Sequence, residues 1–268
     1  MRQPHEIELT KIKYDEPIGL IFDVDELLFD NQNEILAAYA ALLKNRSIEP
    51  AGDERYPGRD LFEIIANLKD KYHLAESVEE LVRERREVYL GNLRASRSGP
   101  CAGVREVFHF LEANRGKINV RVAYTTSSER AFTEIVMKKI FSHIGLGRYA
   151  SDPEAFFYHD AGRPASTCWQ AGLKKKPDPM LYELTIGKLK LPPAQCLAFE
   201  DSLSGFQAAY QAGANIFVVP RPRGRAEFDH LEFNQVYEGR VCKLAAINDV
   251  LPFMNKVFSR KGGDNEQR

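Results

Sequence analysis

The segment from Ile21 to Leu28 limits most strongly what this chain can fold into. It is a short apolar run that carries two aspartates one residue apart, Asp23 and Asp25. Such a run predicts a buried strand of a parallel sheet, because strands covered on both faces read as continuous apolar sequence. Ligands of open α/β sheets lie beyond the carboxyl ends of the strands. Paired carboxylates are costly to bury without a cation, so the segment suggests a Mg²⁺ site, although an isolated D-x-D also fits a solvated acidic turn.

Three later segments place further polar groups at predicted element ends. Residues 120–130 read as a strand, a hydroxyl-rich turn and a helix to about Lys139, although a Ser or Thr before a helix is usually only an N-cap. Residues 174–182 place three lysines, by themselves typical of a solvated surface, before two prolines that open an amphipathic helix. Residues 196–205 are an apolar strand ending in two acids and a small-residue turn, and a helix is expected over residues 206–212.

Together the four segments resemble the haloacid dehalogenase superfamily. Its four motifs would be matched in chain order by D-V-D-E-L-L, T-S-S, K-P-D-P and F-E-D-S-L-S-G. The resemblance covers residues 17–220, and the last two motifs are close to the group that contains β-phosphoglucomutase and the CbbY-like sugar-bisphosphate phosphatases. It implies an α/β fold, with a Rossmann-like core of mostly parallel sheet and an inserted helical cap domain.

The resemblance also implies roles for single residues. Asp23 would be the nucleophile that forms an aspartyl-phosphate, and Asp25 would be the general acid and base. Lys176 would offset negative charge on Asp23 and on the phosphoryl group. The Mg²⁺ ligands would come from the acids of the first and last motifs, namely Asp23, the carbonyl of Asp25, Glu200 and Asp201.

Substrate contacts would come from the second motif and from the cap. Either Thr125 or Thr126 would supply a phosphate-binding hydroxyl; we prefer Thr126, because T-S-S-E-R then falls in step with the S-S-x-x-R helix start of the family. The backbone N–H of Ser127 would also bind phosphate. Asn31 and Arg59 are the candidates on the cap side, where Arg59 would bind a second phosphate bidentately or else be an exposed surface arginine.

The first motif departs from the family at Glu26 and Leu27, where glycine and then threonine or valine are usual. Glycine eases a tight turn, but the carboxylates remain, so we expect an active enzyme. The expected activity is a Mg²⁺-dependent phosphatase of small phosphorylated metabolites, with sugar phosphates or sugar bisphosphates as substrates. A phosphosugar mutase and a catalytically inactive regulatory protein of the same fold are the alternatives. Ile35 stands where β-phosphoglucomutase carries a cap histidine, which weakens the mutase alternative.

The domain organisation follows from the apolar periodicity. Residues 33–100 carry helical stripes and predict the cap, with helices expected over residues 34–45, 60–72 and 78–93. The core is then expected to comprise residues 17–32 and 101–255, with terminal extensions at residues 1–16 and 256–268. The segment of residues 149–175 is longer than the family needs. It is interpreted as an elaborated loop, an oligomer contact or core packing under a long connection. Residues 221–225 are a basic loop, either solvated or steering phosphate.

Composition limits the partners that we expect. The 37 Lys and Arg nearly balance 38 Asp and Glu, which gives no electrostatic footprint for nucleic acid or an anionic membrane. No apolar stretch is long enough to span a bilayer. The four cysteines lack metal-type spacing, so reduced thiols are expected. We therefore expect a monomer that binds a small phosphorylated substrate in the cytoplasm, or in an organelle such as a plastid if a targeting segment was removed.

Overall fold

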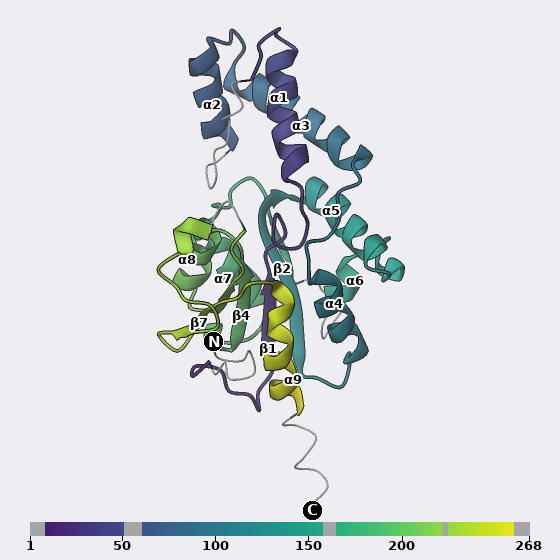
Figure 1. The fold of residues 1–268 in the computed structure, drawn as a ribbon, viewed down its shortest axis with the longest axis vertical. Coiled ribbons are helices and arrows are strands. Elements are labelled where there is room, and N and C mark those ends of the chain that lie inside the picture. Colours follow the sequence, from purple (N-terminus) through teal and green to yellow (C-terminus); the bar gives the residue numbers. More distant parts are fainter. Residues whose placement is uncertain (1–8, 51–60, 158–164, 222–224, 260–268) are drawn as a thin grey trace, which may run out of the picture. The chain divides into compact units, whose positions relative to one another are not determined.

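The computed structural model describes residues 9–50, 61–157, 165–221 and 225–259. The chain divides into two compact units, Met1–Phe29 with Pro100–Arg268 and Asp30–Gly99 (Figure 1). Residues 30–32, which we expected in the core, group with the second unit, because a helix of that unit already begins at Gln32.

A twisted sheet with strand order β3-β2-β1-β4-β5-β7-β6 forms the centre of the first unit (Figure 1). Its strands are β1 Ile18–Phe22, β2 Val120–Glu129, β3 Thr167–Trp169, β4 Cys196–Glu200, β5 Asn215–Val218, β6 Val236–Tyr237 and β7 Val241–Lys243. Neighbouring strands run parallel, except β6 and β7. The mostly parallel α/β core is thus confirmed. β1 and β4 are buried along their whole length, which explains why their sequences are continuously apolar.

Helices connect the parallel strands of this unit. The α-helices are α4 Val104–Ala113, α5 Arg130–His143, α6 Glu154–Phe157, α7 Met180–Leu189, α8 Leu203–Gln211 and α9 Leu251–Ser259. Short 3-10 turns cover Gly147–Tyr149, Pro193–Gln195, Arg225–Phe228 and Ile247–Val250. No helix in the described parts of the chain combines the length and apolar character that crossing a membrane requires.

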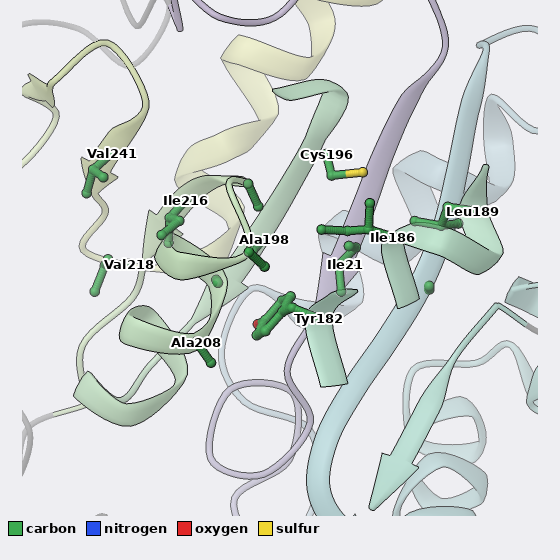
Figure 2. Close-up of a cluster of buried hydrophobic side chains, with 14 of the residues drawn as sticks. Ile21, Tyr182, Ile186, Leu189, Cys196, Ala198, Ala208, Ile216, Val218 and Val241 are labelled. Carbon is green, nitrogen blue, oxygen red and sulfur yellow. The ribbon is translucent and has the colours of Figure 1, made fainter. Parts of the chain in front are cut away.

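The two faces of the sheet carry different cores. On one face, Ile21 of β1 and Ala198 of β4 pack with Tyr182 of α7 and Ala208 of α8 (Figure 2). Adjacent strand residues point to opposite faces, so Phe22 joins an aromatic core instead. That core is built by Phe22, Phe108, Phe141, Phe156, Phe157 and Phe199. Among the interpretations of residues 149–175, core packing therefore holds for Phe156 and Phe157.

The second unit is helical in its described part. Its helices are α1 Gln32–Lys44, α2 Leu61–Tyr72 and α3 Val78–Ala95. Their apolar stripes meet in one cluster that includes Leu42, Ile65, Leu68 and Leu81. The ends of the unit are tied to each other, because Asp30 N donates to Gly99 O at 3.1 Å.

Three element boundaries differ from the sequence prediction. The hydroxyl-rich residues 125–129 belong to β2, and Glu129 precedes α5 without a side-chain cap bond, so both the turn and the N-cap interpretation were wrong. α8 begins at Leu203, because the Ser202 hydroxyl accepts from Gly205 N and caps the helix there. Residues 256–259 of the expected tail belong to α9, which continues to Ser259.

Candidate active site

The candidate site lies at the carboxyl ends of three adjacent strands. β1 is hydrogen-bonded between β2 and β4. Asp23 directly follows β1, and its N–H continues the ladder by donating to Phe199 O of β4 at 3.0 Å. Glu200 ends β4 and Asp201 follows it. Parallel strand order thus brings together acids that are far apart in the sequence.

Lys176 links the acids of two strands. Its ammonium lies 2.5 Å from Asp23 Oδ1 and 2.6 Å from Glu200 Oε1, and it also donates to Thr125 O at 3.1 Å. Its side chain is 5% exposed. The Tyr182 hydroxyl of α7 donates to the same Glu200 oxygen. All three donors of the ammonium are therefore used, and the lysine is fixed between nucleophile candidate and metal-ligand candidate.

The acids exceed the positive charge that is buried with them. Burial raises the pKa of Asp23 to about 8 and that of Asp201 well above its ordinary value. Burial alone would lower the pKa of Lys176, but the Asp23 and Glu200 carboxylates outweigh it and raise that pKa. The lysine therefore keeps its proton, and a single ammonium faces three carboxylates. Burial is the main cause of the raised pKa values of both acids, and repulsion from the neighbouring carboxylates adds to it.

This acidic cluster fits a hard divalent cation. One carboxylate oxygen each of Asp23, Glu200 and Asp201 lies within 4.8 Å of the others. Glu200 Oε2 is buried and has no hydrogen-bond partner among the described residues. Oxygen ligands of this kind are those that Mg²⁺ takes in proteins, and a cation would supply the missing charge.

Asp25 is held apart from this cluster by hydroxyl groups of β2. Its Oδ2 accepts from Thr126 Oγ1 at 3.0 Å and from Ser128 Oγ at 2.6 Å. Both hydroxyls reach this carboxylate from the part of β2 whose pairing with β3 is irregular, between Thr126 and Glu129. Sequence reasoning missed Ser128, because it interpreted this stretch as a turn, and no pattern in the sequence indicates the irregular register that brings Ser128 to Asp25.

The other two candidates of the second motif point elsewhere. Thr125 is buried, and its hydroxyl donates to Leu181 O of α7 at 3.3 Å. The Ser127 hydroxyl accepts from Lys176 N at 3.3 Å. Of the two threonines, Thr126 is the one beside Asp25. Phosphate binding by Thr126, and by the Ser127 N–H, stays a prediction.

Two residues without an expected role support Glu200. One is Tyr182, described above. The other is Gly205 on α8, where a Cβ would lie 1.9 Å from Glu200 Oε2. Only glycine lets this turn of the helix approach the carboxylate so closely. Gly205 was part of the fourth motif, whereas no pattern in the sequence indicated that Tyr182 turns toward the acids.

The cap candidates have no described place in this site. Asn31 belongs to the second unit, where its Nδ2 donates to the Tyr89 hydroxyl at 2.8 Å. Arg59 lies outside the described residues. Substrate binding by both stays a prediction.

The family model of the haloacid dehalogenase-like hydrolases matches residues 19–213. The chain belongs to this family. The match contains all four segments that build the site, so the resemblance found from the motifs is confirmed at the family level. A haloacid dehalogenase-like hydrolase is an enzyme, whereas the roles of the single residues stay predictions.

Two relatives and one structure illustrate where in this family the chain lies. A probable pseudouridine-5'-phosphatase of Drosophila melanogaster is 27% identical over 221 residues, which are 76% of this chain and 81% of the relative. Protein CbbY of Rhodobacter capsulatus is 25% identical over 222 residues, 78% of this chain and 88% of the relative. The crystal structure of CbbY from Rhodobacter sphaeroides in complex with phosphate shares the fold, with a TM-score of 0.65 at 19% identity, covering 87% of this chain and 96% of that one.

Proposed function

We propose that this chain is a Mg²⁺-dependent phosphatase of sugar phosphates or sugar bisphosphates that works through an aspartyl-phosphate on Asp23. One observation carries the proposal. Lys176 bridges Asp23 and Glu200, Asp201 lies beside them, and a fourth carboxylate, that of Asp25, is held separately by hydroxyls. These groups could serve as the nucleophile, the charge-neutralising cation, the metal ligands and the acid that the reaction needs at one sheet edge.

The class of reaction is the coarser part of this function. The chain is a phosphoric monoester hydrolase, as its family and the names of its phosphatase relatives support. The sugar class goes further. It is supported by the relative named probable pseudouridine-5'-phosphatase and by a relative of Thermotoga maritima named phosphorylated carbohydrates phosphatase. The substrate of this chain is therefore proposed as a phosphate ester of a small sugar-containing metabolite.

The first half-reaction needs a nucleophile and an acid. A carboxylate oxygen of Asp23 attacks phosphorus in line with the sugar oxygen, and the Lys176 ammonium offsets the growing charge. Asp25 donates its proton to the sugar oxygen as the ester bond breaks. Asp23, the Asp25 carbonyl, Glu200 and Asp201 would hold Mg²⁺, which would supply further positive charge against the charge that develops during transfer.

The second half-reaction returns the enzyme to its starting state. Asp25, now ionised, takes a proton from water while the water oxygen attacks the phosphorus of the aspartyl-phosphate. Thr126 and Ser128 keep the Asp25 carboxylate on this side of the site during both steps. Phosphate leaves, and Asp23 is a free carboxylate again. Water rather than a sugar hydroxyl is the proposed acceptor, because Ile35 packs against the apolar cluster of its own unit and offers no imidazole for a mutase.

A phosphate-release screen tests this function. Purified protein is incubated with a panel of phosphorylated metabolites, with Mg²⁺ or with a chelator, and both free phosphate and isomeric sugar phosphates are measured. Asp23→Asn serves as the matched control, because the amide has the shape of the carboxylate but cannot form the acyl phosphate. We expect phosphate release only with Mg²⁺ and only from the wild type. Release by folded Asp23→Asn protein, or isomer formation without free phosphate, would refute the proposal.

A further inference from the structure

The turn after Asp25 has a backbone conformation that its residue disfavours. Glu26 has a φ of 61°, the left-handed region in which glycine is tolerated and L side chains are strained. Its N–H donates to Phe29 O at 2.9 Å, which closes the turn. The chain departs from its family at this same position. A turn that is strained here needs support from elsewhere in the structure to persist.

Arg221, which is 195 positions away in the sequence, provides contacts that support this turn. It follows β5, and its half-buried guanidinium donates through Nε to Glu26 O and through Nη2 to Leu27 O at 2.7 Å. Two donors of one rigid plane therefore bind two successive carbonyls, which fixes the orientation of both peptide groups. Residues 221–225 suggested a solvated or phosphate-steering loop, but the Arg221 side chain is directed to the backbone of the catalytic turn.

The two hydrogen bonds of Arg221 act on the residue with the left-handed φ and on the residue that follows it. Arg221 thereby offers the backbone support that a residue other than glycine needs at position 26.

We propose that Arg221 is a positioning residue, which holds the Glu26–Leu27 turn so that the neighbouring Asp25 keeps its place. The inference rests on the proposed function, since it assigns Asp25 to proton transfer and its carbonyl to the metal. Without Arg221 the two carbonyls lose their shared donor, and the strained peptide groups can rotate. The Asp25 carboxylate then leaves its hydroxyl partners on β2, and proton transfer slows while substrate binding changes little.

The kinetic test compares Arg221→Ala with Arg225→Ala, which removes the same charge from the exposed first residue of the 3-10 turn Arg225–Phe228. We expect Arg221→Ala to lower kcat roughly 10- to 100-fold at nearly constant KM, because small misplacements of catalytic groups cost rates of this order. Added guanidinium ion should restore part of kcat. Arg221→Lys should have a kcat below that of the wild type, because one ammonium group cannot donate to both carbonyls in the plane of a guanidinium. Arg225→Ala should match the wild type. A raised KM at unchanged kcat would show phosphate steering instead and overturn the proposal.

A double-mutant cycle with Glu26→Gly tests the reason for the effect. Glycine adopts the turn without strain, so Arg221→Ala should cost less kcat in the Glu26→Gly background than in the wild type. Equal losses in both backgrounds would contradict the proposed compensation. If Arg221→Ala alone folds poorly, the double variant is compared with Glu26→Gly: we expect only a small loss of kcat there, and a loss of roughly 10-fold or more would contradict the proposed compensation.

Amide hydrogen exchange separates this inference from the proposed function. Exchange is followed by mass spectrometry in peptides that cover residues 24–29, without substrate. Arg221→Ala should exchange faster there than the wild type, whereas Arg225→Ala should not. If the protein has no phosphatase activity but Arg221→Ala still exchanges faster in these peptides, the proposed function is refuted while the support of the turn by Arg221 stands. Unchanged exchange in Arg221→Ala would refute the inference, whatever the activity of the enzyme.

Discussion

At the scale of single residues, Asp25 has the most informative surroundings, because two hydroxyls bind one of its oxygens. Asp25→Asn keeps the side-chain shape but cannot transfer a proton. We expect kcat for an alkyl phosphate to fall by about 10²–10⁴, the usual contribution of a general acid or base. An aryl phosphate, whose leaving group departs without a proton, should lose less. Steady-state kinetics on both substrates measure the difference, and equal losses would argue against the acid role.

The contact between Gly205 and Glu200 gives a second residue-scale prediction. Gly205→Ala puts a Cβ where Glu200 Oε2 now lies, so the carboxylate must move. We expect the Mg²⁺ concentration for half-maximal activity to rise by roughly 10-fold or more, the effect of disturbing groups that orient ligands. Gly187→Ala in α7 is the matched control, because its Cβ meets nothing within 4 Å. An unchanged Mg²⁺ requirement in Gly205→Ala would remove Glu200 from the metal site.

Some residues of the candidate site could be predicted from the sequence, whereas others are identified only by their contacts in the structure. The four acids and Lys176 follow strand ends or open a helix, and such positions are visible in the sequence. Ser128 and Tyr182 are not, because their contacts depend on the register of β2 and on the rotation of α7. The left-handed φ of Glu26 could be suspected, since glycine is usual there. Its support by Arg221 could not, because the two residues are 195 positions apart.

At the scale of elements, the start of α3 shows how local chemistry sets a boundary. Ser77 accepts from Glu80 N at 3.2 Å, and the Glu80 side chain accepts from Ser77 N at 2.9 Å, which is a complete capping box. Ser77→Ala should destabilise the helical unit by about 1 kcal/mol. Ser77→Thr, which keeps the hydroxyl, should retain most of that stability. Chemical denaturation followed by circular dichroism measures both, and identical curves for Ser77→Ala and the wild type would contradict the cap.

Element bounds were predictable where periodicity and caps agree. The expected helix over residues 78–93 coincides closely with α3, Val78–Ala95. The hydroxyl-rich end of β2 was misjudged, because Thr and Ser favour turns and caps locally, whereas Thr126 and Glu129 on either side of an irregularity pair with β3. The short β3 itself, Thr167–Trp169, was hidden in a long connection. Tertiary pairing overrode local preference in both cases.

At the scale of the whole molecule, the acidic cluster links stability to pH and metal. The pKa of Asp23 in the folded protein, about 8, lies above its ordinary value of 3.8. Stability from this group is therefore fully present below about pH 4 and is lost as the pH rises through about 8. We expect the Tm of metal-free protein to fall between about pH 6 and about pH 8.5, and Mg²⁺ to raise Tm more at the higher pH, where the carboxylates are ionised.

Calorimetry with Mg²⁺ or with a chelator measures this linkage without any substrate. Asp201→Asn is the control, because it removes one of the repelling charges and one proposed ligand together. It should weaken both the fall of Tm with pH and the gain from Mg²⁺. A gain from Mg²⁺ that is the same at both pH values would contradict binding to these acids.

The helical unit has entry and exit points that are already joined. Asp30 N donates to Gly99 O, while Phe29 and Pro100 pair by a bridge on the side of the sheet unit. The helical unit is therefore an insertion whose two ends meet at one place in the sheet unit. Its length and content can change while Ile18 stays opposite Val120 and the strands keep their register. Replacement of everything from Asp30 to Gly99 is therefore expected to leave the folding of the sheet unit intact.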